Sequence, residues 1–261
     1  MYRIAISNQK GGVGKTTDAI CLAGALADAG HDVLAADLDP QGWLTIRLGL
    51  QEAYEAEPPS LMNGMMQPRE HDAHNLIVEH EEFDVLPSNV DMFTLEKQLI
   101  GSGRQPNQRL RILLEDIDED EYDFLVVDAP PSLGPINDSV LIATERVVIP
   151  VKADRLSRLA IDHLLNQIES IENHYGLNID IAGVLVSDVD YPLDNSQEDA
   201  LEWFRDTFSM APVEVIRHRV GIERSLDKGG SIFGDQAEDV DQREPFERMA
   251  MKLANSAGVG Q

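Results

Sequence analysis

The residues best suited to chemistry lie in a glycine-rich stretch near the amino terminus, which reads NQKGGVGKTT over residues 8–17. Glycines let a backbone fold tightly and aim its N–H groups at phosphate oxygens. A lysine then reaches the terminal phosphates and a threonine hydroxyl binds Mg²⁺, which predicts these roles for Lys15 and Thr16. The stretch departs from the pattern G-x-x-x-x-G-K-[ST] at one position, because Gln9 replaces the first glycine.

Carboxylates follow two apolar segments of strand length. Asp37 is the last residue of the segment DVLAAD, and Asp39 follows it by two positions. Asp128 is the last residue of the segment FLVVD. Ligands of parallel sheets collect at the carboxyl ends of the strands, and carboxylates there can serve Mg²⁺ and an attacking water. Each motif alone is also typical of a simple turn, but the phosphate loop upstream favours the chemical interpretation.

The elements that must position these residues alternate between strands and helices. A phosphate loop requires a strand before it and a helix after it, and residues 3–7 and 16–29 have the composition for both. Further apolar segments predict strands at 32–37, 83–86, 124–128, 147–151 and 181–187. Helical periodicity covers residues 90–100, 105–116, 155–175, 197–208 and 240–257. We therefore expect an α/β P-loop NTPase fold, a doubly wound, mostly parallel sheet with helices on both faces.

Length and composition limit the classes of protein. The chain has 261 residues, which favours one domain spanning 1–261, with the polar, methionine-rich residues 51–74 as a surface excursion. No apolar run is long enough to span a membrane, and no secretory signal is expected. Cys21 is the only cysteine, which excludes an internal disulfide and a Cys-ligated cluster within one chain. These features predict a cytoplasmic protein.

The net charge of −26, from 47 acidic and 21 basic residues, argues against a dedicated basic nucleic-acid binder. A polyanionic partner surface is one explanation. The acidic residues are spread along the whole chain, however, which favours a general solubility adaptation. Acid-rich, lysine-poor surfaces resemble those of proteins from salt-loving organisms, and we expect a halophilic source.

The octet KGGVGKTT resembles the deviant Walker A motif of the ParA/MinD family of P-loop ATPases. The resemblance implies that Lys10 contacts the nucleotide of a partner subunit, so that ATP binding forms a homodimer. It further implies that Lys10 and Lys15 are catalytic cations, that Asp39 orients the attacking water, and that Asp37 lies near the metal. Mg²⁺ would be held with the help of Thr16, Asp37 and Asp128. The nucleotide-binding residues would be Lys10, Gly11, Gly12, Val13, Gly14, Lys15, Thr16 and Thr17.

Within that family, four segments resemble ParA-type partition ATPases: DLDPQG, FDVLPSN, YDFLVVDAPPSLG and PVKADRLSRLAIDHLL. The resemblance covers residues 1–190 well. It implies ATP-dependent, non-specific DNA binding, a ParB-like or other cargo-adaptor partner, and a nucleoid-associated location. The alternatives are a MinD-like ATPase that cycles on a membrane and an ATP-binding regulatory switch. A membrane role is disfavoured because the apolar face of the last helix is rich in Ala and Met, which is typical of internal packing.

The sequence departs from the ParA pattern at Arg217-His218-Arg219, where the family usually carries Pro-x-Asn. That element often contacts the nucleotide base, so we assign no base contacts. Three locally basic windows are candidates for DNA contact, at residues 100–112, 146–158 and 215–230. Each is also consistent with a solvated or salt-bridged face.

Overall fold

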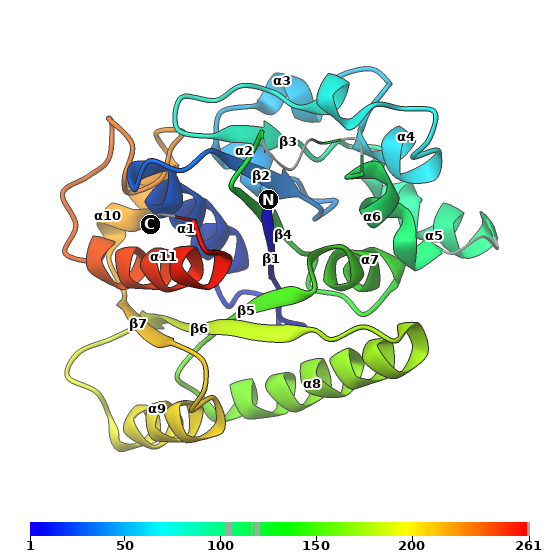
Figure 1. Ribbon diagram of the computed structural model, residues 1–261. Coiled ribbons are helices and arrows are strands. Elements are labelled where there is room, and N and C mark those ends of the chain that lie inside the picture. The colour runs from blue at the N-terminus through cyan, green and yellow to red at the C-terminus, as the bar shows by residue number, and fades with distance from the viewer. Residues whose placement is uncertain (103–105, 116, 118–120, 260–261) are drawn as a thin grey trace.

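The computed structural model describes residues 1–102, 106–115, 117 and 121–259. At its centre, these residues form a seven-stranded sheet in the order β3-β2-β4-β1-β5-β6-β7 (Figure 1). Every neighbouring pair in the sheet is parallel, which confirms the predicted doubly wound α/β class. The strands are β1 (Tyr2–Ile6), β2 (Val33–Asp37), β3 (Asp84–Leu86), β4 (Phe124–Asp128), β5 (Arg146–Val151), β6 (Asp180–Val189) and β7 (Val213–Arg217).

Helices cover both faces of the sheet (Figure 1). One face packs against α1 (Lys15–Asp28), α2 (Trp43–Arg47), α10 (Val220–Leu226) and α11 (Arg243–Ala257). The other packs against α4 (Leu61–Met66), α5 (Met92–Ser102), α6 (Arg109–Leu113), α7 (Pro135–Thr144), α8 (Arg155–Tyr175) and α9 (Asn195–Thr207). Short helical turns complete the fold at α3 (Gln51–Tyr54), η1 (Ala73–Leu76) and η2 (Pro106–Gln108).

The core lies in two layers because side chains alternate across each strand. In β4, Phe124 and Val126 face the α1 layer, whereas Leu125 and Val127 face the α7 layer. All four side chains are completely buried. A strand covered on both faces is apolar at every position, which is why β4 is so readily predicted from sequence.

The register of the central strands sets the carboxyl edge of the sheet. Ile6 of β1 and Asp37 of β2 are both aligned with Asp128 of β4. The chain leaves all three strands at the same level, so the loops that follow them start side by side. The predicted phosphate loop and both carboxylate motifs therefore share one edge of the molecule.

Residues 51–74 differ from the surface excursion that the sequence predicts. Leu61, Met65 and Ala73 are buried in the core layer that also holds α5 and α6. The segment consists of elements of four to six residues, α3, α4 and η1, which are too short to show a helical period. Residues 60–74 therefore contribute side chains to the core, whereas none of residues 51–59 is buried.

The last helix packs as predicted. In α11, Phe246, Met249 and Leu253 are at most 1% exposed and join the layer of α1. Gly183 of β6 makes room for this contact, since a Cβ there would lie 2.6 Å from the Met249 sulfur. The apolar face of α11 is thus used inside the protein.

We predict that Phe246→Ala lowers the free energy of unfolding by about 3–5 kcal/mol, the range for a fully buried aromatic side chain. Met251→Ala is the matched control on the same helix, because Met251 is 59% exposed, and should change stability by about 0.5 kcal/mol or less. Urea unfolding followed by circular dichroism measures both. Equal effects of the two substitutions would contradict the packing of α11.

Candidate functional site

The loop between β1 and α1 has the backbone of an anion cradle. Gly12 and Gly14 have φ values of 70° and 97°, in the left-handed region that favours glycine. Val13 between them is completely buried and anchors the loop to the protein. The loop leads directly into the amino terminus of α1, whose free N–H groups and dipole attract negative charge. The geometry is suited to a polyphosphate.

Lys15, at the first position of α1, supplies a buried cation. Its side chain is only 7% exposed, and this burial lowers the pKa of the ammonium, while Asp128 and Asp39 act in the opposite direction. A lysine held in such a water-poor site interacts strongly with an incoming anion, because few water molecules compete. This arrangement fits the predicted contact with terminal phosphates.

Thr16 and Asp128 connect α1 to the end of β4. The Thr16 hydroxyl donates a hydrogen bond of 2.7 Å to Oδ2 of Asp128. The other carboxylate oxygen, Oδ1, is buried and has no hydrogen-bond partner among the described residues. Burial and the nearby Asp37 raise the pKa of Asp128 well above its usual range. A buried carboxylate oxygen without a partner is destabilising, and a cation would satisfy it.

Mg²⁺ fits this donor set. It usually keeps several waters and uses one or two protein ligands together with substrate phosphates. Within the described part of the chain, no group of three or more His, Cys, Asp or Glu side chains is arranged to hold a metal by itself. Thr16 and Asp128 would therefore hold Mg²⁺ jointly with the phosphates of a bound nucleotide.

Asp37 is fully buried and already has several partners. Oδ2 accepts hydrogen bonds from the Thr45 backbone N–H at 2.9 Å and from the Thr45 hydroxyl at 2.7 Å. Oδ1 accepts a longer bond of 3.2 Å from the Asp39 N–H. Burial raises the pKa of Asp37 to about 7. The Asp37 side chain fixes the loop that carries Asp39. Its contribution to Mg²⁺ binding stays a prediction.

Asp39 lies on that loop. Burial raises the pKa of its carboxyl, and the charge of the nearby Lys15 partly offsets this by lowering the pKa. One carboxylate oxygen accepts a bond of 2.9 Å from the Gln41 N–H. Ser88 follows β3, and its hydroxyl donates a hydrogen bond of 2.8 Å to the Asp39 carbonyl. Ser88 in turn donates its N–H to Thr45. Sequence reasoning missed Ser88, a polar residue two positions after β3, and Thr45, which lies within α2 and has no such signal.

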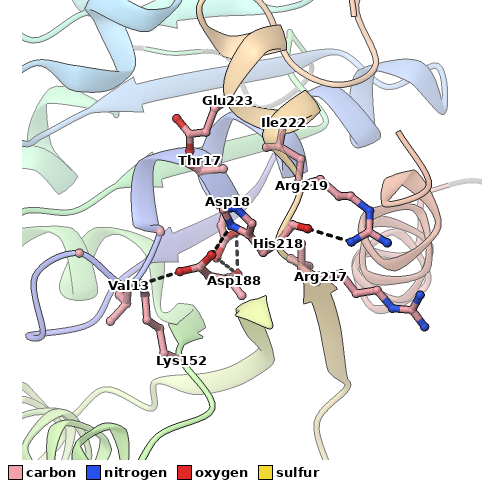
Figure 2. A pocket seen from close by; sticks show the side chains of 14 residues that line it. Val13, Thr17, Asp18, Lys152, Asp188, Arg217, His218, Arg219, Ile222 and Glu223 are labelled. Carbon is pink, nitrogen blue, oxygen red and sulfur yellow. Dashed lines mark hydrogen bonds and ion pairs between the residues drawn. The ribbon is translucent and has the colours of Figure 1, made fainter. Parts of the chain in front are cut away.

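A cavity of about 270 Å³ continues from the phosphate loop toward the ends of β6 and β7 (Figure 2). Asp18 of α1 lies at its floor, only 1% exposed, and accepts hydrogen bonds of 2.8 and 2.9 Å from the Ser187 hydroxyl. At the mouth, Asp188 pairs with Lys152 at 2.7 Å and His218 at 2.6 Å. The Arg217-His218-Arg219 element lines this cavity. The cavity adds to the space that a ligand bound at the phosphate loop can occupy.

Comparison with known proteins agrees with the geometry. A family model described as an AAA domain matches residues 1–182. The chromosome-partitioning ATPase Soj of Thermus thermophilus is 37% identical over 185 residues, 71% of this chain and 68% of that protein. The sporulation initiation inhibitor Soj of Bacillus subtilis is 33% identical over 208 residues, 78% of this chain and 80% of that protein. An uncharacterised Mycobacterium tuberculosis protein is 34% identical, and the chain spans about 60% of its length.

Solved structures resemble the whole chain. The McdA–ATP complex of Cyanothece has a TM-score of 0.82 at 20% identity, covering 100% of this chain and 98% of that one. Cobyrinic acid a,c-diamide synthase of Mycobacterium smegmatis, with a bound ATP analogue and magnesium, has a TM-score of 0.80 at 25% identity, covering 100% and 97%.

The fold and the phosphate loop define a P-loop NTPase. More narrowly, the chain belongs to the AAA-domain ATPase family that includes Soj and ParA.

We predict that Lys15→Ala weakens ATP binding by about one to two orders of magnitude, the value of a lost charge-assisted contact. Turnover should collapse together with binding. Isothermal titration calorimetry with ATP and Mg²⁺ measures the affinity, with Lys97→Ala on the exposed surface of α5 as the control. Tight ATP binding by the Lys15 variant would overturn the phosphate-loop assignment.

Proposed function

We propose that the protein is an ATP-dependent partition ATPase of the ParA type. ATP closes two copies into a sandwich dimer, the dimer binds DNA without sequence preference, and a ParB-like or other cargo-adaptor protein stimulates the hydrolysis that resets it. The observation that carries the proposal is the placement of Lys15, Thr16 and Asp128 around one phosphate cradle, with a second lysine, Lys10, on the same loop. The Soj relatives support partition as the cellular role.

The proposed chemistry is in-line attack of water on the γ-phosphate. Lys15 stabilises the negative charge that develops on the transferring group, and the backbone N–H groups of the loop hold the phosphates. Thr16 and Asp128 would hold Mg²⁺, which would neutralise charge on the phosphate oxygens. Asp39 orients the water, and Asp37 positions Asp39 through its backbone.

We predict that Asp39→Ala still binds ATP but hydrolyses it about 10²-fold more slowly, the range for a lost proton-handling group. The cradle and the Thr16–Asp128 contact do not depend on this side chain, so the ATP-bound dimer should accumulate. Steady-state phosphate release and calorimetry separate the two effects, with Asp190→Ala, exposed at the same edge, as the control. Hydrolysis at the parent rate would show that Asp39 is only a turn residue.

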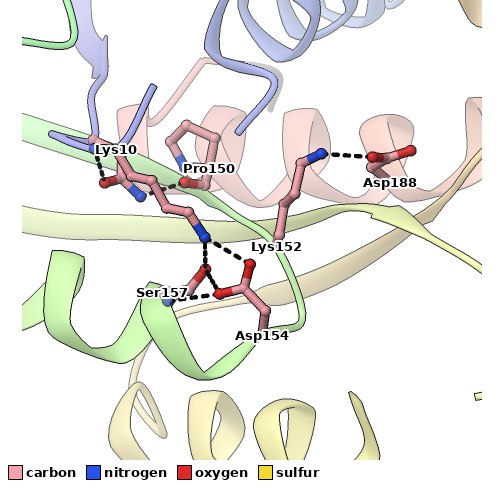
Figure 3. A network of polar contacts seen from close by, with 7 residues as sticks. Lys10, Pro150, Lys152, Asp154, Ser157 and Asp188 are labelled. Carbon is pink, nitrogen blue, oxygen red and sulfur yellow. Dashed lines mark hydrogen bonds and ion pairs between the residues drawn. The ribbon is translucent and has the colours of Figure 1, made fainter. Parts of the chain in front are cut away.

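Lys10 is held within its own chain in this structure (Figure 3). Its Nζ pairs with Asp154 at 2.6 Å and lies 3.5 Å from the Ser157 hydroxyl. Asp154 also caps α8 by accepting a bond of 2.8 Å from the Ser157 N–H. Asn8 fixes the Lys10 backbone by accepting its N–H at 3.0 Å.

A role for Lys10 on the partner's nucleotide requires that it leaves Asp154. The two side chains are 24% and 42% exposed, and ion pairs this open to water contribute about 0–1 kcal/mol. A charge-assisted contact with a phosphate is stronger, so exchanging one anion for the other is favourable. The ion pair thus orders the Lys10 side chain, and little free energy is lost when Lys10 leaves Asp154.

We predict that Lys10→Ala binds ATP as a monomer but fails to dimerise, and therefore loses both hydrolysis and ATP-dependent DNA binding. Lys10→Arg should rescue these only in part, because a planar guanidinium differs from a compact ammonium. Size-exclusion chromatography with light scattering, with and without ATP, measures the dimer. If Lys10→Ala dimerises as well as the parent, the trans-acting role is wrong.

Two of the three basic windows are largely occupied by internal contacts. In 100–112, Arg109 donates to the Met66 carbonyl, Arg111 pairs with Glu145, and Arg104 lies outside the described residues. In 146–158, Lys152 pairs with Asp188 and Arg158 donates to the Asp199 carbonyl, while the Arg155 side chain is not described. Arg146 of this window stacks over the Tyr2 ring at 4.3 Å.

The third window, 215–230, lies beside the nucleotide cavity. Arg219 and Lys228 pair with Asp241 and Glu238, whereas Arg217 stacks over the Tyr191 ring at 4.0 Å. An arginine on an aromatic ring keeps its N–H donors available for phosphate. Arg217, unlike the stacked Arg146, lines the nucleotide cavity, so we propose DNA contact in this window, and nucleoid association follows from it. Anisotropy of a labelled random duplex in ATP against ADP tests it, and equal binding in both would contradict it.

The membrane-cycling alternative receives no support from α11, because its apolar face is buried. None of the described helices is long and apolar enough to cross a membrane. Liposome co-sedimentation in ATP distinguishes this alternative from DNA binding. The halophilic origin stays a prediction.

A further inference from the structure

The strand β7 forms one margin of the sheet, and its outer edge is open. It is the last strand in the sheet order and lies between α11 and α9 (Figure 1). At the opposite margin the edge of β3 is partly covered, because Val78 and Val85 exchange backbone hydrogen bonds of 2.8 and 2.9 Å. Among the described residues, no segment pairs in this way with the outer edge of β7. An open edge offers unpaired backbone groups to another chain.

The hydrogen bonds around β7 show which of its backbone groups point outward. The Pro212 carbonyl accepts a bond of 2.8 Å from β6, so it points inward. The Arg217 N–H points the other way and donates a bond of 2.6 Å to the Gln242 side chain. Successive residues of a strand direct their backbone groups to opposite edges. Val213 and Val215 therefore share the orientation of Arg217, and their N–H and C=O groups face outward.

A groove of about 380 Å³ lies along this edge. Val213 and Val215 line it from the strand, and Tyr191 and Arg205 line it on the side of α9. The start of α11 forms the other wall, through Gln242, Glu244, Pro245 and Arg248. The five residues of β7 extend over about 17 Å. The groove therefore matches an extended peptide segment of about five residues.

The charges that remain free in the groove are positive. Its three carboxylates are all paired within the protein: Glu214 with Arg248 and Lys252, Glu244 with Arg248, and Asp241 with Arg219. Arg205 has no ion pair or hydrogen bond with another described residue. Arg217 stacks on the Tyr191 ring and has no carboxylate partner in the described part of the chain. Free guanidinium groups bind carboxylates through charge-assisted, often bidentate hydrogen bonds.

The two free arginines lie on the same side of the sheet. Val213 and Val215 pack against the core layer of α8 and α9, whereas Ile216 belongs to the layer of α11. Side chains alternate along a strand, so Arg217 points to the α9 side, where Arg205 also lies. An added strand would direct every second side chain to that side. Two carboxylates at alternating positions of such a strand could therefore face the two arginines.

We propose that the outer edge of β7 binds an extended, acidic segment of a partner protein as an additional strand of the sheet. The outward N–H and C=O groups of Val213 and Val215 pair with the backbone of the segment, which is the main source of affinity in strand addition. Arg205 and Arg217 bind its carboxylates and select for them. The inference is independent of the proposed partition cycle, because it uses no nucleotide and no residue of the phosphate loop.

The charges distinguish this occupant from others. Two-fold pairing of β7 with itself would place the free arginines of both copies in one groove, where like charges repel. A basic segment would meet the same two cations and no free carboxylate among the groove residues. The net charge of −26 also disfavours acidic segments over most of the remaining surface, which confines them to this groove.

The test uses two labelled peptides of eight residues with blocked termini. One alternates Asp and Val, and the matched control has Lys in place of every Asp. In fluorescence anisotropy with the full chain and no nucleotide, the Asp peptide should bind at least about tenfold more tightly than the Lys peptide. Equal affinity for the two peptides, or no binding of the Asp peptide, overturns the proposal.

Variants separate the backbone and side-chain contributions. Val215→Pro removes one outward N–H and none of the inward bonds, and edge strands tolerate proline at such positions. Arg205→Glu reverses a free charge that has no place in the nucleotide site or in the proposed DNA window. Each should weaken binding of the Asp peptide at least about tenfold. Arg69→Glu, at an exposed position between α4 and η1, should bind it like the parent.

Thermal unfolding shows whether each variant is folded. If proline disrupts the strand, the exposed Arg205→Glu substitution still tests the groove. Unchanged peptide binding by Arg205→Glu overturns the role of the arginines.

Amide hydrogen exchange followed by NMR tests the added strand directly. The peptide should slow exchange of the Val213 and Val215 N–H groups at least about tenfold, while the inward N–H of Glu214 changes little. Peptide binding without this protection would mean attachment through side chains alone and would contradict strand addition. Analytical ultracentrifugation without peptide provides the last check. A dimer that forms without nucleotide and is lost in Val215→Pro would make a second copy the occupant and overturn the partner segment.

Discussion

The hydrogen bond between Thr16 and Asp128 is the contact on which the site depends. It exists because β1 and β4 are neighbours and Ile6 lies in register with Asp128, so that the first turn of α1 starts beside the end of β4. The remaining Asp128 oxygen is buried without a partner among the described residues. Leaving such a group unsatisfied costs on the order of 1–3 kcal/mol. The protein maintains a destabilised carboxylate where a cation is needed.

The two aspartates after β2 divide the work between structure and chemistry. Asp37 is buried, and its oxygens accept hydrogen bonds from Thr45 and from the Asp39 backbone. Asp39 is more open and keeps one carboxylate oxygen outside the hydrogen bonds that hold the loop. Two residues of the same type thus have different roles because a strand ends between them. The Ser88 hydroxyl, from the neighbouring β3 loop, fixes the same turn.

Many of the strands and helices, and the phosphate loop, could be predicted from the sequence because their hydrophobic patterns or motifs are local. Strands covered on both faces are apolar throughout, so β2 and β4 were predicted closely. The edge strand β7 was not, because only alternate residues of it are buried, although it has five residues like β2 and β4. Helix α7 was missed because it is buried on almost every side and shows little periodicity. The phosphate loop could be identified because its residues are contiguous.

Contacts between distant residues could not be found in this way. Lys10 and Asp154 are 144 positions apart, and Asp18 and Ser187 are 169 positions apart. Neither pair has a local pattern, and each forms only when the sheet brings its strands together. The predicted helix at 105–116 was also shorter in the structure, where α6 covers Arg109–Leu113 and residues 105 and 116 lie outside the described part.

The assembly of the site from β1, β2 and β4 has a thermodynamic consequence. These strands are separated along the chain by up to about half its length, so an unfolded or partly folded chain contains no fragment able to bind a nucleotide as the native site does. A ligand that binds only the native state adds to stability by mass action, by about 2.7 kcal/mol at a concentration 100 times its dissociation constant. The nucleotide pool of the cell would then set how much of this protein is folded as well as how much is active.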